Sequence, residues 1–185
     1  MKTLHLFSIL LICVPLVSCD EGSSFGSSEP TKRAIGSGTF KATIGSEAWS
    51  SEAGSPYIYG ALANDWLLLS GQSADTVGSV ITKKKISLYI RFPKTGALTV
   101  GPETSNVYAL VTISEGSSTR YYMSASTNSG TITLTKLDSN IRSAIGTFSI
   151  VVVADGNLSG EKLTITNGSF DMAFQPYASK LAPIE

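Results

Sequence analysis

The side chains that most often carry enzyme chemistry are scarce in this chain of 185 residues. It contains one histidine, His5, and two cysteines, Cys13 and Cys19. His5 and Cys13 lie inside an apolar run at residues 4–17, which we expect to be removed as a leader. The remaining protein would then have no histidine, and its only thiol would be Cys19. Ser-His-Asp and Cys-His nucleophile systems, histidine-based zinc sites and disulfides are excluded from such a protein.

Carboxylates are the other candidate catalytic groups, since a pair of them can hydrolyse a glycosidic bond. The candidates are Asp65, Asp75, Glu103, Glu115, Asp138, Asp155, Glu161 and Asp171. Most lie beside Gly, Ser or Asn, where an acidic side chain commonly caps a turn. Calcium could bind at residues 138–140 or 155–157, but neither segment has the ligand spacing of an EF-hand loop. We therefore predict no catalytic residue, no metal site and no cofactor.

Cys19 ends the stretch LVSC and is followed by two acidic residues. The apolar run before it is shorter than the about 20 residues of a membrane-spanning helix and contains Pro15, as expected for a signal peptide. LVSC resembles the lipobox of bacterial lipoproteins. That resemblance implies a diacylglycerol on the Cys19 sulfur, cleavage just before Cys19, and acylation of the freed amine. We therefore predict a signal peptide at residues 1–18 and a lipid attachment site at Cys19.

Such an anchor places the protein in the cell envelope. Each buried methylene contributes about 0.8 kcal/mol, and two or more acyl chains give stable attachment. Residues 19–38, rich in Gly and Ser, predict a flexible tether with a root-mean-square span of about 24 Å. We expect a membrane-anchored lipoprotein that faces the periplasm or the cell surface. Asp20 and Glu21 leave the choice of membrane open.

Beyond the tether, apolar residues recur at every second position, which indicates β-strands. The clearest alternations begin at Phe40, Ile86 and Val107. Further strands are predicted at 57–63, 66–71, 97–100, 120–126, 131–137, 146–154 and 161–174. No apolar pattern of period 3.6 is long enough for a helix, and we expect a loop at 138–144. These strands predict a β domain at residues 39–177, followed by a C-terminal tail at 178–185.

Turn residues and aromatic residues refine this prediction. Asn64-Asp65 predicts a two-residue hairpin loop that pairs Ala63 with Trp66. Asn167-Gly168 predicts either a second hairpin or a β-bulge inside one long strand. The aromatic core is expected to contain Trp49, Trp66, Phe148, Phe170 and Phe174; a sugar-stacking platform is the alternative for these rings.

We therefore predict an all-β fold, an antiparallel meander of about ten strands that forms a β-sandwich, with a closed lipocalin-like barrel as the alternative. Fourteen basic and fourteen acidic side chains cancel, so no long-range field attracts nucleic acid. The one basic run, Lys83 to Lys85, is interpreted as a solvated strand entrance, with a phosphate or lipid-headgroup contact as the alternative.

The last third of the chain contains GTITLTKLDSNIRSAIGTFSIVVVA and KLTITNGSFDMAF, and Phe40-x-Ala42 and Trp49 precede it. These segments resemble uncharacterised bacterial lipoproteins of the Bacteroidetes lineage, grouped as a domain of unknown function. The resemblance covers residues 40–174, departs slightly at Ala144-Ile145, and implies the fold and the anchoring. It implies no catalytic residue, because that family has no established activity.

Three function classes remain. The preferred one is a non-enzymatic lipoprotein whose β domain binds a protein or carbohydrate partner or has an envelope-associated role. The alternatives are a carrier of small apolar ligands inside a barrel and a polysaccharide hydrolase that uses two carboxylates.

Overall fold

The computed structural model describes residues 34, 37–52 and 58–176, which form β-strands and turns and no helix. The strands are β1 (Gly38–Ile44), β2 (Glu47–Ser50), β3 (Ile58–Ala63), β4 (Trp66–Val77), β5 (Val80–Arg91), β6 (Gly96–Val100), β7 (Val107–Glu115), β8 (Ser118–Met123), β9 (Gly130–Asp138), β10 (Ser143–Ala154), β11 (Lys162–Ala173) and β12 (Gln175–Pro176). The predicted signal peptide, Cys19 and the predicted tail at 178–185 lie outside the described residues.

All twelve strands belong to one sheet with the order β12-β3-β4-β5-β7-β8-β10-β11-β1-β2; β9 also pairs with β10, and β6 with β9. Neighbouring strands are antiparallel except β12 and β3, which are parallel. The order has two ends, so the sheet is open and is not closed into a barrel. The all-β antiparallel prediction is confirmed, and the lipocalin-like barrel is wrong.

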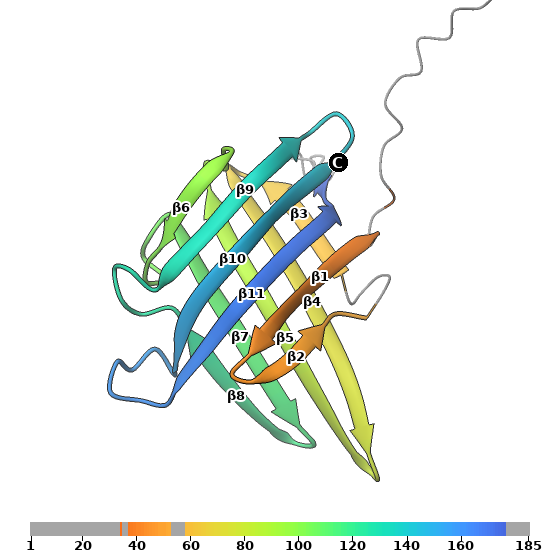
Figure 1. Cartoon of the computed structure of the whole chain (residues 1–185), viewed down its shortest axis with the longest axis vertical. Helices are drawn as coiled ribbons and strands as arrows, with labels where there is room; N and C mark the ends of the chain where they lie inside the picture. Colours follow the sequence, from red (N-terminus) through yellow and green to blue (C-terminus); the bar gives the residue numbers. More distant parts are fainter. Residues whose placement is uncertain (1–33, 35–36, 53–57, 177–185) are drawn as a thin grey trace, which may run out of the picture.

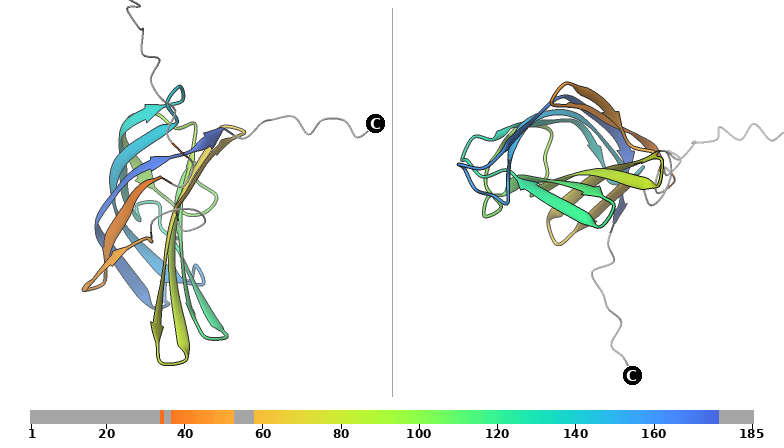
Figure 2. Two further views of the ribbon diagram at one scale, coloured as in Figure 1. Left: turned by 90° about the vertical axis from the view of Figure 1, so that its right-hand side faces the viewer. Right: turned by 90° about the horizontal axis from the view of Figure 1, so that it is seen from below.

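The sheet bends into two layers (Figure 1). One layer contains β3, β4, β5, β7 and β8, and the other contains β1, β2, β6, β9, β10 and β11; Figure 2 shows them facing each other. Only two residue pairs join β8 to β10, at Val153–Met123 and Ala154–Tyr122. On the other side, β12 follows β11 after Phe174 and pairs with β3 of the facing layer. Narrow joins of this kind let a continuous sheet form a sandwich.

The space between the layers is filled by the side chains that the alternating pattern assigned to one face. On β5, Ile86, Leu88 and Ile90 are fully buried, and Phe40 on β1 is 1% exposed. Polar residues occupy most of the intervening positions and face outward, as expected for a sandwich with solvent on both sides. The strand pattern therefore predicted the core correctly.

The aromatic core was predicted correctly except for one residue. Trp49, Phe148, Phe170 and Phe174 are buried, and the Phe40 ring contacts the rings of Trp49, Phe148 and Phe170. Trp66 is only half-buried and contacts Tyr108. The physical reason is the two-residue period of β4: Leu67 and Leu69 point inward, so Trp66 must point outward.

The first predicted hairpin is confirmed, because Ala63 pairs with Trp66. Asn64 and Asp65 both have positive φ, at 47° and 67°, as a type I′ turn requires. At Asn167-Gly168 the bulge is correct and the hairpin is wrong: β11 runs through as one strand, and its register against β10 shifts between Phe148 and Ile150.

Other strand boundaries differ from the prediction mainly by length. Residues 139–142 form turns between β9 and β10, as expected for a loop. The strand predicted at 66–71 extends to Val77, and β2 and β12 were not predicted. The extension matters because it makes the β4–β5 hairpin longer than the rest of its layer.

Candidate functional site

The segments Gly146-Thr147-Phe148 and Gly168-Ser169-Phe170 form a cross-strand packing unit between β10 and β11. Gly146 pairs with Phe170, and Phe148 pairs with Gly168. An added Cβ on Gly146 would lie 2.6 Å from the Phe170 ring, and one on Gly168 would lie 2.6 Å from the Phe148 ring. Each glycine therefore leaves room for the ring of the opposite strand, and this unit supports the core.

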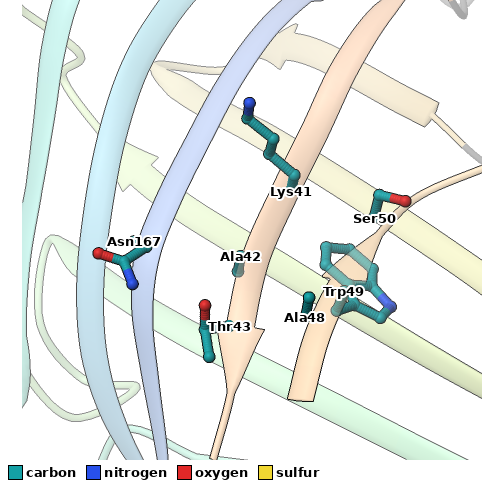
Figure 3. A pocket seen from close by; sticks show the side chains of 7 residues that line it. All are labelled: Lys41, Ala42, Thr43, Ala48, Trp49, Ser50 and Asn167. Carbon is teal, nitrogen blue, oxygen red and sulfur yellow. The ribbon is translucent and has the colours of Figure 1, made fainter. Parts of the chain in front are cut away.

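The outer surface beside this unit has a shallow hollow over β1, β2 and the bulge of β11 (Figure 3). Its volume is about 440 Å³. Lys41, Thr43 and Ser50 supply polar groups, Asn167 borders it from the bulge, and Trp49 lines it. Trp49 is 6% exposed, and its Nε1–H donates to Ser73 Oγ of the facing layer at 2.9 Å. Its indole therefore belongs to the core and offers no open ring face in this hollow.

A second hollow, of about 470 Å³, lies on the other side of Asn167. Most of its lining residues bear hydroxyl groups: Thr131 and Thr133 on β9, Thr147 and Ser149 on β10, and Ser169 on β11. We call the two hollows together the Asn167 face. It can donate and accept several hydrogen bonds on a surface whose only charged lining residue is Lys41, which suits a neutral polar ligand.

Asn167 has φ +51°, a left-handed conformation that asparagine adopts more easily than most residues. The bulge places its exposed side chain between the two hollows. The Asn-Gly pair was recognised in the sequence, but the residues of this face come from five strands. Only the register of those strands shows the face.

A different cluster covers the outer face of β4, β5 and β7. Tyr89 and Tyr108 stack with their ring centroids 4.4 Å apart, and Trp66 meets Tyr108 edge-on at 5.8 Å. Arg91 holds its guanidinium 5.9 Å from the Trp66 ring centroid. Because the facing rings of Tyr89 and Tyr108 cover each other, this cluster differs from the open ring faces expected for a sugar-stacking platform. Burial raises the pKa of both tyrosines, with a smaller contribution from Glu103.

At one end of the sandwich, Phe92 borders a hollow of about 470 Å³ that Leu62, Leu137 and Phe174 also line. Phe92 is 56% exposed and has φ +50°, which is uncommon for a bulky residue. Its N–H donates to the Asp65 carbonyl at 2.7 Å. Asp65 and Ser139 add polar groups to this mostly apolar hollow.

The candidate carboxylates are distributed over several turns and strands. Asp65 lies in the β3–β4 turn, Glu103 in the β6–β7 connection and Asp155 in the β10–β11 connection; Asp75 is on β4, Glu115 on β7, Asp138 on β9 and Asp171 on β11, while Glu161 directly precedes β11. Asp155 and Glu161 lie in the same connection, and the negative charge of each contributes to raising the pKa of Tyr122.

Glu161 stabilises the corner between the two layers. Its Oε2 accepts from the Tyr122 hydroxyl at 3.2 Å and lies 3.6 Å from Arg120. Burial raises the pKa of Tyr122, Arg120 acts in the opposite direction, and the hydrogen bond to Glu161 adds to the increase. These contacts join β8 to the start of β11 across the narrow β8–β10 join.

In the two segments considered for calcium, side-chain oxygens accept hydrogen bonds from backbone N–H groups of the same turn. Asp138 Oδ1 accepts from the backbone N–H of Asn140 at 3.0 Å and of Ile141 at 3.3 Å. Asn157 Oδ1 accepts from the Ser159 N–H at 3.0 Å. Among the described residues, no three His, Cys, Asp or Glu side chains gather into a group that could hold a metal ion.

No helix in the described part of the chain has the length and apolar character needed to cross a bilayer. The chain matches no protein-family model, no curated protein and no solved structure.

Proposed function

We propose that this protein is a lipoprotein, attached to a membrane of the cell envelope through Cys19, whose β-sandwich binds a partner and catalyses no reaction. The observation that carries the proposal is the stretch LVSC at the end of a short apolar leader. The Gly- and Ser-rich residues that follow connect this stretch to β1, which begins at Gly38. The resemblance to envelope lipoproteins agrees with this arrangement.

Mass spectrometry of the protein from a bacterial host with the lipoprotein pathway tests the anchor directly. We expect a chain that begins at Cys19 and carries acyl chains. The variant Cys19→Ala should move from the membrane fraction to the soluble fraction, or keep its leader uncleaved. Equal membrane association of a processed Cys19→Ala variant and the parent would refute the proposal.

We assign binding to the Asn167 face, and neutral oligosaccharides are the ligand class that its chemistry fits. The support is the set of hydroxyl and amide groups that five strands present on one surface. NMR titration with neutral oligosaccharides should shift the amide signals of Asn167 and Thr147 before others. The variant Thr147→Val should weaken the effect, whereas Thr112→Val, on the outer face of the other layer, should not. Shifts centred on Trp66 and Tyr108 would instead assign binding to the aromatic cluster.

A further inference from the structure

The β4–β5 hairpin extends beyond the layer to which it belongs. Its strands pair over their full length, from Trp66–Arg91 to Val77–Val80. β3 covers β4 only as far as Gly71, and the Ala74 N–H donates to Glu52 Oε1 at 3.0 Å. On the other side, β7 covers β5 as far as Thr82, and the Gly116 N–H donates to the Ile81 carbonyl at 3.1 Å, so residues 77–80 extend beyond their neighbours. The end of the hairpin therefore projects from the sandwich, as Figure 1 and the left view of Figure 2 show.

Aliphatic side chains are concentrated at this projecting tip. Val77 is 78% exposed, Val80 41% and Ile81 47%. Together they account for three of the seven large hydrophobic residues exposed in the described chain. Gly78 and Ser79 form the turn between them. Single exposed aliphatic residues are ordinary, but three within five positions at the furthest point of a hairpin form a patch.

We propose that this tip inserts into the interfacial region of the bilayer to which Cys19 is attached, so that the domain has two membrane contacts. The inference rests on the proposed lipid anchor. A hairpin suits a contact limited to the interfacial region, because the facing backbone N–H and C=O groups of its two strands are paired with each other and the outward-facing groups can stay hydrated among the headgroups. Amphipathic helices at this interface bury their apolar side chains about 5–10 Å into the boundary between headgroups and acyl chains, and we expect a similar depth for the tip.

The geometry allows both contacts at once. The Ala173 N–H donates to the Ser37 carbonyl, and an added Cβ on Gly60 would touch the Ala173 carbonyl, so β1 begins beside Gly60. Gly60 pairs with Leu69, and the tip lies eight residues further along β4, about 26 Å away at strand spacing. The predicted tether spans about 24 Å on average and about 65 Å when extended. It can therefore reach the bilayer that the tip touches.

Charge contributes little to this contact, because the basic and acidic side chains near the tip balance each other. Lys83 and Lys85 are exposed, and Lys84 is paired with Glu47, with Nζ 2.6 Å from Oε2. Asp75 and Glu115 lie on either side of Thr82, close to the turn. Burial of the aliphatic tip is therefore the driving force, and binding should persist on uncharged lipid.

The experiment places a polarity-sensitive fluorophore at the tip of the full mature protein. Ser79→Cys supplies the attachment site, and Ser117→Cys, in the turn of the neighbouring β7–β8 hairpin, supplies the matched control. The lipidated proteins are reconstituted in phosphatidylcholine vesicles with or without phosphatidylglycerol. We expect the label at residue 79 to shift to the blue and to be quenched by brominated lipid more strongly than the label at residue 117. The combined variant Val77→Ser, Val80→Ser and Ile81→Ser should reduce the inserted fraction at least tenfold.

Three outcomes would overturn the tip contact. They are a label at residue 79 that stays water-exposed on protein bound to vesicles, equal signals at residues 79 and 117, and insertion that needs phosphatidylglycerol and disappears in high salt. A soluble protein partner for the tip is the interpretation that the first outcome would favour. Failure of the anchor is distinguishable, because mass spectrometry of the purified wild-type protein would then find no acyl chains on Cys19. The substituted positions are exposed, so an unchanged circular dichroism spectrum is expected for the serine variant.

Discussion

At the residue scale, the bulge of β11 depends on a backbone conformation that few side chains tolerate. Asn167 has φ +51°, and a β-branched residue there would be strained. We expect Asn167→Val to lower the free energy of unfolding by about 1–2 kcal/mol, whereas Asn167→Gly should change it by less than about 0.5 kcal/mol. Urea denaturation of the two variants measures the difference. Equal stability of both would mean that the bulge does not constrain this residue.

The neighbouring glycine is constrained by a ring and not by φ. A Cβ on Gly168 would approach three atoms of the Phe148 ring at 2.6 Å. Gly168→Ala should therefore cost about 1–3 kcal/mol of stability, as overpacked cores do. In a Phe148→Leu background the same change should cost clearly less, because the smaller side chain leaves room. An identical cost in both backgrounds would show that the ring is not the cause.

At the element scale, the sequence predicted what depends on local pattern and missed what depends on neighbours. The two-residue period of β5 and β7 and the Asn64-Asp65 turn were readable because each is encoded by adjacent residues. Trp66 was misplaced because hydrophobicity alone does not distinguish the inner face of β4 from an outer face covered by other rings. The Asn167 face could not be predicted either, since its residues meet only through the register between β1, β2 and β9–β11.

The aromatic pair on β5 and β7 predicts how stability depends on pH. Burial raises the pKa of Tyr89 and Tyr108 above the ordinary value of 10.0. In the unfolded chain these hydroxyls ionise near pH 10, while in the folded protein they stay protonated to higher pH. Their contribution is therefore complete below pH 10 and is lost as the pH rises through the raised values. Urea denaturation at pH 8 and pH 10.5 should show lower stability at the higher pH.

The control for this pH dependence is a variant that cannot ionise at the two positions. Tyr89→Phe combined with Tyr108→Phe should keep the stacked rings and make the loss of stability between pH 8 and pH 10.5 smaller. Tyr122, whose pKa burial also raises, remains in that variant and accounts for part of the residual dependence. A pH dependence as steep as that of the parent would remove the tyrosine pair from the explanation.

At the scale of the whole molecule, the two layers are held together by their shared core and by a few polar contacts between them. Trp49 on β2 reaches across to β4, where its Nε1–H donates to Ser73 Oγ at 2.9 Å. Both side chains are buried, at 6% and 7% exposed. A buried indole N–H without an acceptor is costly, so this bond fixes how the edge strand β2 lies over the longer hairpin.

Ser73→Ala removes the acceptor and should cost about 1–3 kcal/mol, because the indole N–H then loses its partner in a buried position. Trp49→Phe removes the donor together with apolar contact area, and its cost should be larger. When both changes are combined, the second should cost less than it does alone, since no donor remains unsatisfied; a coupling energy of about 1 kcal/mol is expected from a double-mutant cycle in urea. Strict additivity would mean that water replaces the lost acceptor, and that packing alone, through Phe40 and the other rings of the core, holds β2 against the opposite layer.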